Sequence, residues 1–250
     1  MPQPTDAAPC LVINLSPDSV PSPALAQLLV ATRNGYDWPV GTGAEVSQQN
    51  IINLEATVAG RLTHLNAANA HQIVVDVSSW AGNYANPQAQ LVAATPAQQE
   101  EMLVAIGNLI SGNLAVGIDT LSALPGISLV IASKIFRFCA PQVGAAVDRH
   151  SSYFFNSLPI DGHGSATNFE REWADGQHNI SRLAGYAPLV YARNRNEYIQ
   201  CYLPLLGRIA SRLNESDRQY RCAATGELRL WTPADVEMAA YYYWACNGAR

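Results

Sequence analysis

The turn Leu124-Pro125-Gly126-Ile127 constrains the fold of this chain more than any other feature, because it interrupts two apolar segments that both have helical spacing. After the turn, apolar residues recur with the period of a helix at Ile131, Ala132, Ile135 and Phe136. This pattern predicts a helix, a tight turn and a second helix over about residues 115–139. The first backbone N–H groups of a helix have no carbonyl partner within it and readily bind phosphate. The pattern therefore favours a contact with nucleic acid.

An aspartate lies downstream at a characteristic distance. Asp148 follows Val130 by eighteen residues, within the run Ala-Val-Asp-Arg-His. The turn and this aspartate together resemble the helix-hairpin-helix DNA glycosylase superfamily over about residues 121–155. In that family the hairpin holds DNA, and the aspartate attacks the glycosidic bond of a damaged or modified base.

The resemblance implies a mainly α fold with two helical lobes and a cleft between them. We expect this domain to span residues 23–250, with the hairpin unit at about 115–139 and the aspartate segment at 145–155. Residues 1–22 are rich in Pro, Ser and Asp, and we expect them to form a flexible or extended N-terminal arm.

Two positions depart from the family pattern. The family hairpin usually reads Leu-Pro-Gly-Val/Ile-Gly, and Ser128 replaces the second glycine here. Serine keeps the backbone amide and begins helices well. Members with lyase activity carry a lysine four residues after the first hairpin glycine, but this chain has Val130 there. An aspartate without that lysine favours a monofunctional glycosylase, which uses water as the nucleophile.

The resemblance also implies how DNA is bound and cleaved. The hairpin amides near Gly126 and Ser128 would hold one phosphate, with K⁺ or Na⁺ as an optional structural ion. Asp148 would stabilise the oxocarbenium-like sugar and activate a water, once the target base has left the duplex stack. An N-cap role for Asp148 at a helix beginning with Arg149 is the structural alternative, and the two roles are compatible. The residues predicted to contact DNA are Pro125, Gly126, Ile127, Ser128, Val130, Arg149 and His150.

Aromatic residues in segments rich in turn residues are candidates to line a base pocket. They are Tyr36, Trp38, Trp80 and Tyr84, with Tyr153 one helical turn after Arg149 and His150. The aromatic run from Tyr241 to Trp244 favours core packing instead.

Lys134 is the only lysine among the 15 basic residues. It lies one helical turn after Val130, on the same face of the predicted helix. Schiff-base chemistry would have to use this lysine or the N-terminal amine. A structural or DNA-positioning role is the main interpretation, and direct catalysis is the alternative.

Composition limits the remaining classes. The net charge is −5, but thirteen of the 15 basic residues follow position 120, which leaves a basic surface in the second half available for phosphate. Five dispersed cysteines predict neither a disulfide framework nor an iron–sulfur cluster, and the scattered histidines predict no metal site. No apolar run reaches the length of a membrane span, so we expect no membrane contact. We also expect a cytoplasmic monomer, because the N-terminus lacks the basic start of a signal peptide. Apart from the optional ion at the hairpin, we expect no cofactor.

Helical spacing or helix-start signals predict helices at 23–32, 44–67, 95–110, 196–213 and from Thr232 onward, while 71–80 is ambiguous between helix and extended chain. Residues 156–180 read as loop.

Several functional interpretations remain open from the sequence. Within the glycosylase interpretation, the enzyme serves base-excision DNA repair, or it removes a modified base of phage DNA in antiviral defence. A non-catalytic hairpin DNA-binding module is one rival. A bifunctional glycosylase/lyase that uses Lys134 is the other.

Overall fold

The computed structural model describes residues 13–82, 90–169 and 188–247, and these are mainly helical, as the sequence predicts. In chain order the helices are α1 (Pro23–Asn34), α2 (Ala44–Leu62), α3 (Ala67–Trp80), α5 (Pro96–Ile110), α6 (Leu114–Ala123), α7 (Leu129–Cys139), α8 (Arg149–Ser157), α9 (Pro188–Glu197), the π-helical turn η1 (Tyr198–Tyr202), α10 (Leu203–Glu215) and α11 (Pro233–Asn247). Two short antiparallel hairpins complete the described fold: β1 (Pro159–Ile160) with β2 (Gly164–Ser165), and β3 (Tyr220–Arg221) with β4 (Leu228–Arg229).

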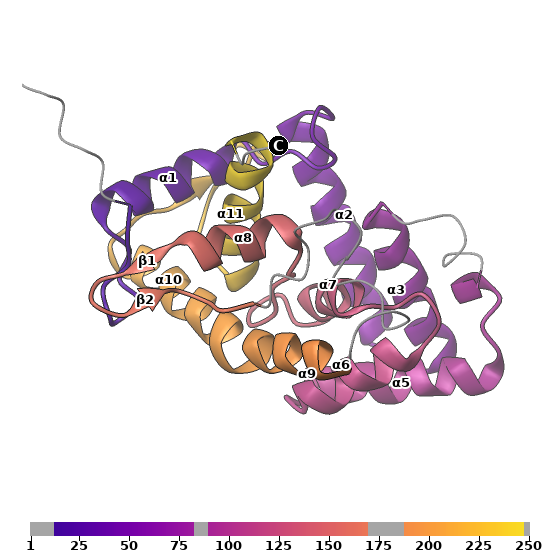
Figure 1. The fold of residues 1–250 in the computed structure, drawn as a ribbon. Coiled ribbons are helices and arrows are strands. Elements are labelled where there is room, and N and C mark those ends of the chain that lie inside the picture. Colours follow the sequence, from indigo (N-terminus) through magenta and orange to yellow (C-terminus); the bar gives the residue numbers. More distant parts are fainter. Residues whose placement is uncertain (1–12, 83–89, 170–187, 248–250) are drawn as a thin grey trace, which may run out of the picture.

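Helix α7 is the central element of the fold (Figure 1). It contacts α2, α3, α5 and α6, and every one of its residues except Val130 is buried. Helix α11 packs against α1, α8 and α10. The segment that carries Asp148 follows α7 and leads into α8, so it connects the helices around α7 with those around α11.

The predicted helix–turn–helix is confirmed as α6, the turn and α7. The Ile127 N–H donates to the Leu124 carbonyl at 3.2 Å, and both side chains are buried. Gly126 has a φ of +77°, which a side chain would strain. Ser128 caps α7 by accepting from the Ile131 N–H at 3.3 Å, so the serine fulfils the helix-starting role expected of it.

The described part of the expected N-terminal arm, residues 13–22, is anchored rather than loose. The Leu15 N–H donates to the Pro159 carbonyl at 2.9 Å, and the Leu15 carbonyl accepts from Asp161 N–H at the same distance. The Leu15 side chain is fully buried, so it secures this segment against β1. The burial of Leu15 thus stabilises an ordered conformation of this segment, although its composition is rich in Pro and Ser.

Two other segments refine the expected elements. The ambiguous residues 71–80 belong to helix α3, whose N-cap Asn66 accepts from the Asn69 N–H at 2.9 Å. The helix expected at 196–213 has two parts. The π-helical turn η1 comes first, and α10 follows it, with Pro204 in its first turn.

Gly144 allows the segment before Asp148 to lie directly on α7. A Cβ atom at this position would stand 2.8 Å from the Phe136 carbonyl oxygen and 2.9 Å from the Arg137 Cα. These are backbone atoms of a buried helix, which cannot turn aside as a flexible side chain can. Gly144 therefore sets how closely the Asp148 segment approaches α7.

We expect Gly144→Ala to destabilise the protein by about 1–3 kcal/mol, because the added methyl group must displace buried backbone. Gly107→Ala in α5 is the matched control: nothing lies within 4 Å of its added Cβ, and alanine favours the helix. The control should be neutral or stabilised by about 0.5–1 kcal/mol. Urea unfolding followed by circular dichroism measures both, and equal effects would contradict the close-approach role of Gly144.

Candidate active site

Asp148 is the N-cap of α8, and its two carboxylate oxygens have different surroundings. Oδ1 accepts from the His150 N–H at 2.8 Å and from the Ser151 N–H at 2.9 Å, and Ser151 Oγ accepts from the Asp148 N–H at 3.0 Å. Within the described part of the chain, Oδ2 accepts no hydrogen bond. The capping role predicted as an alternative is thus present, and it leaves one half-buried carboxylate oxygen unused.

The chain before Asp148 is held from two sides. Tyr198 and Tyr202 of η1, both fully buried, donate from their hydroxyl groups to the carbonyls of Ala145 at 2.6 Å and Ala146 at 2.9 Å. The Val147 N–H donates to Ser133 Oγ of α7 at 3.0 Å. Three consecutive residues are therefore fixed, which sets the position of Asp148 independently of its own cap.

Lys134 points from α7 into an aromatic and acidic environment. Its side chain is only 7% exposed, and Nζ lies 5.0 Å from the ring centroid of Trp38 and 5.6 Å from that of Trp80. Burial lowers the pKa of Lys134, while the charges of Asp148 and Glu237 oppose that decrease. Within the described residues, Nζ forms no ion pair within 4.0 Å, and the two indole rings offer it cation–π contacts instead.

Glu237 of α11 is the third charged member of this group, and the sequence analysis did not identify it. Its side chain is 6% exposed. Burial raises the pKa of Glu237 well above its ordinary value, Asp148 raises it further, and Lys134, Arg137 and Arg33 lower it. We call Lys134, Asp148 and Glu237 the charged cluster. These residues are connected only by their arrangement in space. In the sequence, Glu237 reads simply as part of the helix predicted from Thr232 onward.

Aromatic rings lie beside Lys134 and beside neighbours of the other two cluster residues. Tyr241, one helical turn after Glu237, packs edge-on against Trp38 with ring centroids 5.3 Å apart, and His150 packs edge-on against Tyr241 at the same distance. Trp80 packs against Phe138 with centroids 5.0 Å apart. Burial lowers the pKa of His150, and its Nδ1 is buried without a hydrogen-bond partner in the described chain.

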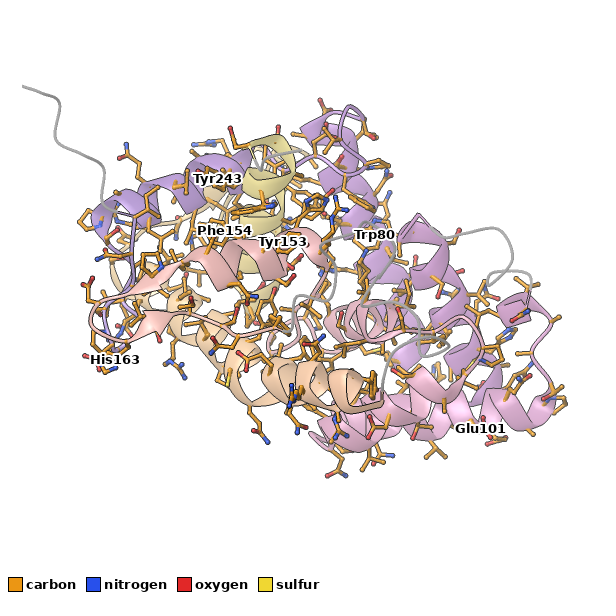
Figure 2. All side chains as sticks on the ribbon, viewed as in Figure 1. Trp80, Glu101, Tyr153, Phe154, His163 and Tyr243 are labelled. Carbon is orange, nitrogen blue, oxygen red and sulfur yellow. The ribbon has the colours of Figure 1, made fainter. Side chains whose placement is uncertain are left out.

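The residues expected to line a base pocket do not all lie in the same part of the structure. Trp38 and Trp80 lie beside Lys134 as described, whereas Tyr36 is 4% exposed and packs behind Tyr241 with centroids 6.0 Å apart. Tyr153 lies on α8 (Figure 2). Its ring packs against that of Trp244, with centroids 6.1 Å apart. Tyr84 lies outside the described residues. The core-packing role expected for Tyr241 is present, but this residue also adjoins the charged cluster.

The hairpin presents backbone more than side chains. Pro125 and Gly126 are exposed, and the N–H groups of Gly126, Ser128 and Val130 donate no hydrogen bond within the described chain. Ile127 is 2% exposed, so its side chain anchors the turn in the core. Arg149 is exposed at the start of α8, while its neighbour His150 is half-buried.

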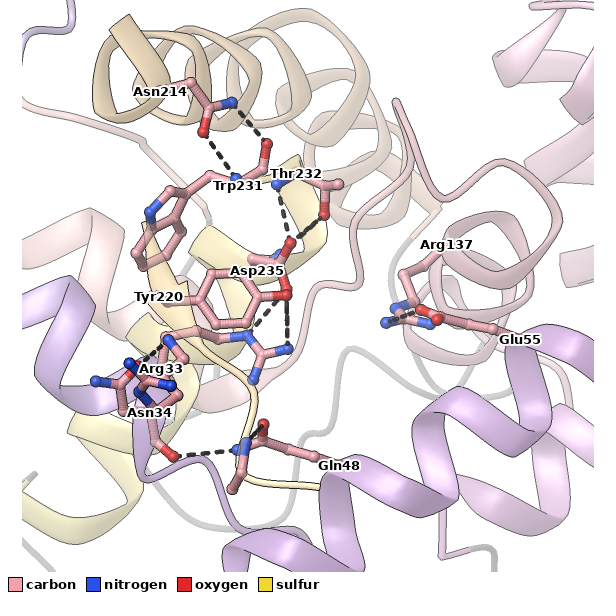
Figure 3. A network of polar contacts seen from close by, with 12 residues as sticks. Arg33, Asn34, Gln48, Glu55, Arg137, Asn214, Tyr220, Trp231, Thr232 and Asp235 are labelled. Atoms are coloured by element: carbon pink, nitrogen blue, oxygen red, sulfur yellow. Dashed lines mark hydrogen bonds and ion pairs between the residues drawn. The ribbon is translucent and has the colours of Figure 1, made fainter. Parts of the chain in front are cut away.

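Two further buried cations near this region are paired (Figure 3). Arg137 of α7 pairs with Glu55 of α2 at 2.7 Å, and Arg33 of α1 pairs with Asp235 of α11 at 2.9 Å. Asp235 also accepts from the Thr232 N–H at 2.9 Å and the Thr232 hydroxyl at 2.7 Å. Their carboxylate partners are therefore committed, and these two ion pairs hold α2 and α1 against the helices that carry the charged cluster.

A cavity of about 850 Å³ lies apart from the charged cluster, and its lining includes Leu109, Phe136, Leu203, Arg208 and Trp231. None of the three cluster residues lines it. Over residues 13–82, 90–169 and 188–247, no group of three His, Cys, Asp or Glu side chains is placed to hold a metal ion. No helix in these ranges is long and apolar enough to cross a membrane.

We expect Asp235→Asn to lower the free energy of unfolding by about 3–5 kcal/mol, because it leaves the buried Arg33 charge without a partner. Glu215→Gln removes the exposed ion pair with Arg212 and serves as the control, with an expected change below about 1 kcal/mol. Thermal and urea unfolding of both variants would measure this difference. A small effect of Asp235→Asn would mean that water reaches Arg33.

Lys134, Asp148 and Glu237 come from three different helices or their caps, and electrostatic interactions link them. No family model, curated protein or solved structure matches the chain.

Proposed function

We propose that the protein is a DNA glycosylase, which hydrolyses the N-glycosidic bond of a damaged or modified base and leaves an abasic site. The observation that carries this proposal is the environment of Asp148. One carboxylate oxygen is used as a helix cap, the other accepts no hydrogen bond from the described residues, and a buried lysine and glutamate interact with the group electrostatically. A single oriented carboxylate is the group that an oxocarbenium-like transition state requires.

The chemistry follows from this arrangement. A base inside a duplex hides its C1′–N bond, so the target nucleotide must leave the stack before it can react. As the bond to the base breaks, positive charge develops on the sugar, and Asp148 Oδ2 stabilises that charge. The same oxygen accepts a proton from the water that attacks C1′. The cap bonds on Oδ1 hold the carboxylate in one orientation throughout.

The hairpin supports the proposal as a phosphate contact. Its free N–H groups at Gly126, Ser128 and Val130 lie at the start of α7, where the helix dipole also favours an anion. Arg149 is exposed next to Asp148 and would neutralise a neighbouring phosphate. A monovalent cation at the hairpin would act in the same way as the amides, by holding one phosphate oxygen.

The aromatic residues give the proposal a place for the extruded base. Trp38 and Trp80 are half-buried and flank the Lys134 ammonium group, so their rings can contact a planar base. Either a damaged base of cellular DNA or a modified base of foreign DNA is compatible with this environment. The substrate panel therefore includes both.

We expect Asp148→Asn to abolish base release while leaving the fold intact, because asparagine retains the N-cap but lacks the charge. The substrates are a panel of damaged duplexes and hypermodified phage DNAs, and abasic sites are measured as strand cleavage after alkali. Asp148→Ala separates the two roles: it should lose both activity and about 0.5–2 kcal/mol of stability.

The controls define what would contradict the proposal. Cleavage that requires alkali, and that disappears in Asp148→Asn, establishes a monofunctional glycosylase and identifies its substrate. If the wild-type protein binds DNA but releases no base, and Asp148→Asn binds equally well, the protein is a non-catalytic DNA-binding module.

A specific observation favours a bifunctional glycosylase/lyase as the second candidate. Lys134 replaces the missing family lysine from one turn further along α7, and its ammonium group interacts with Asp148. Burial lowers the pKa of this amine, which increases the neutral fraction that can attack a sugar carbon. Attack at C1′ would expel the base and form a Schiff base with the opened sugar.

For this candidate, we expect borohydride to trap a covalent protein–DNA adduct during base release, and we expect Lys134→Met to lose the adduct. Methionine has an unbranched apolar side chain of similar length, which can occupy the buried space beside Trp38 and Trp80, so the fold should survive. Denaturing gel electrophoresis detects the adduct. Base release without an adduct would exclude the lyase and leave the hydrolytic mechanism.

A further inference from the structure

The ammonium group of Lys134 has different surroundings from the other buried cations of the described chain. Arg33 and Arg137 are buried to a similar degree, and each forms a direct ion pair. Nζ of Lys134 lies instead beside two indole rings, 5.0 Å from the centroid of Trp38 and 5.6 Å from that of Trp80. Within the described residues it forms no ion pair and donates no hydrogen bond. The folded chain therefore leaves its N–H donors unused.

Nζ of Lys134 is nevertheless reached by water. The described side-chain atoms that are sealed from water and lack a hydrogen-bond partner include Nη1 of Arg33 and Nη1 of Arg137, but not Nζ of Lys134. Because Nζ also lacks such a partner, it differs from these atoms in being accessible. A donor that water reaches, and that no protein acceptor occupies, is available to an acceptor on a ligand.

The two indole rings can contact a planar ligand next to this donor. Trp38 and Trp80 are both half-buried, with ring centroids 6.4 Å apart and 48° between the ring planes. Trp38 Nε1 donates to the Trp80 carbonyl at 3.3 Å, so the Trp38 N–H is already used. Trp38 therefore offers a ligand its apolar ring, and Lys134 offers a hydrogen bond.

A hydrogen bond between neighbouring residues places Lys134 close to the residue proposed to act on the sugar. The Val147 N–H donates to Ser133 Oγ at 3.0 Å. Ser133 directly precedes Lys134, and Val147 directly precedes Asp148. The segment that carries the aspartate is thus fixed to α7 at the position of the lysine.

A series of ring contacts joins the same two residues by a second route. Beginning at the Trp38 ring beside Lys134, the rings of Trp38, Tyr241 and His150 lie in contact, with centroids 5.3 Å apart at each step. The backbone N–H of His150 donates to Asp148 Oδ1 at 2.8 Å. Lys134 and Asp148 therefore belong to one site, in which a single nucleotide can present its base to the lysine and its sugar to the aspartate.

We propose that Lys134 recognises the target base: its ammonium group donates a hydrogen bond to a carbonyl oxygen of the extruded base and stabilises the negative charge that reaches this oxygen as the glycosidic bond breaks. This inference rests on the proposed glycosylase function. Because lysine has donors and no acceptor, it selects a base edge with acceptors, such as O6 of a guanine-type purine or O4 of a thymine-type pyrimidine. The substrate class is therefore a base with a carbonyl oxygen, and adenine-type bases are excluded.

The proposed step is balanced in atoms and charge. The C1′–N bond breaks, and its electron pair passes to the base, where the carbonyl oxygen beside Lys134 shares the negative charge. The ammonium group keeps its proton throughout. Water bonds to C1′ and gives a proton to Asp148, and the departing base takes a proton from solvent. Asp148 then releases its proton to solvent, so the net reaction is hydrolysis.

The first test compares three variants in single-turnover base release, on the duplex identified with the substrate panel. We expect Lys134→Met to be about 100-fold slower than wild-type protein or more, because it lacks the donor directed at the developing charge. Lys134→Arg keeps a charged donor but has no amine that can attack the sugar, and it should be at least about 10-fold faster than Lys134→Met. Arg61→Met, which removes a half-buried cation paired with Asp76, is the control and should match wild-type protein.

Replacement of the carbonyl oxygen by sulfur tests the contact itself. Sulfur accepts hydrogen bonds more weakly than oxygen does, so the ratio of the oxo rate to the thio rate should fall by about 10-fold from wild-type protein to Lys134→Met. Each carbonyl position of the base is substituted in turn, and the position at which the ratio falls identifies the contacted oxygen. The ratio is measured within one protein, so a partly unfolded fraction of a variant cancels. A purely structural role of Lys134 would slow both bases equally and leave the ratio unchanged.

The outcomes separate this inference from the function on which it rests. A released base without a carbonyl oxygen, a Lys134→Met variant with the wild-type rate, or an unchanged ratio would each overturn it and leave the glycosylase function standing. A borohydride adduct that is lost in both Lys134→Met and Lys134→Arg would identify the lysine as a nucleophile instead. Absence of base release by the wild-type protein would remove both proposals together.

Discussion

The burial of two cations on α7 is the constraint on which the site depends. Lys134 and Arg137 are both almost inaccessible to water, and an unpaired buried charge is strongly unfavourable. A helix cannot provide its own counter-charges when all but one of its residues face the interior. The carboxyl groups must therefore come from other elements, and they do: Glu55 from α2, Asp148 from the start of α8 and Glu237 from α11. Folding around α7 thus gathers acids that lie far apart in the sequence.

Gathering acids in this way leaves the two cations with different surroundings. Arg137 forms a direct ion pair, which uses the planar guanidinium and commits Glu55. Lys134 lies near two indole rings, and Asp148 and Glu237 interact with it without an ion pair within 4.0 Å in the described chain. Arg137 thus has a direct counter-charge, although its Nη1 is buried without a hydrogen-bond partner in the described chain. Lys134 instead depends on aromatic faces and on the charges of Asp148 and Glu237.

Local signals predicted the parts of the site that local structure determines. The Pro-Gly turn and Ser128 encode the hairpin through backbone conformation and capping, and Asp148 followed by Ser151 encodes a capping box. Glu237 and Tyr241 could not be identified in this way, because an acid near the start of a helix and a tyrosine within it are ordinary features. The electrostatic interaction of Glu237 with Asp148 and the ring contact of Tyr241 with Trp38 arise only when α11 packs against α8 and α1. Leu15 is a similar case, since nothing local predicts that it anchors the expected arm.

A buried acid beside a second acid is costly, so its presence needs a reason beyond packing. An apolar side chain of similar volume would fill the space near Tyr198 and Tyr202 without desolvating a carboxyl group. Burial raises the pKa of Glu237 well above its ordinary value, and the neighbouring charge of Asp148 raises it further. A neutral carboxyl group costs less to bury than a carboxylate does. The interior around α11 therefore favours the protonated form of Glu237 in the folded protein.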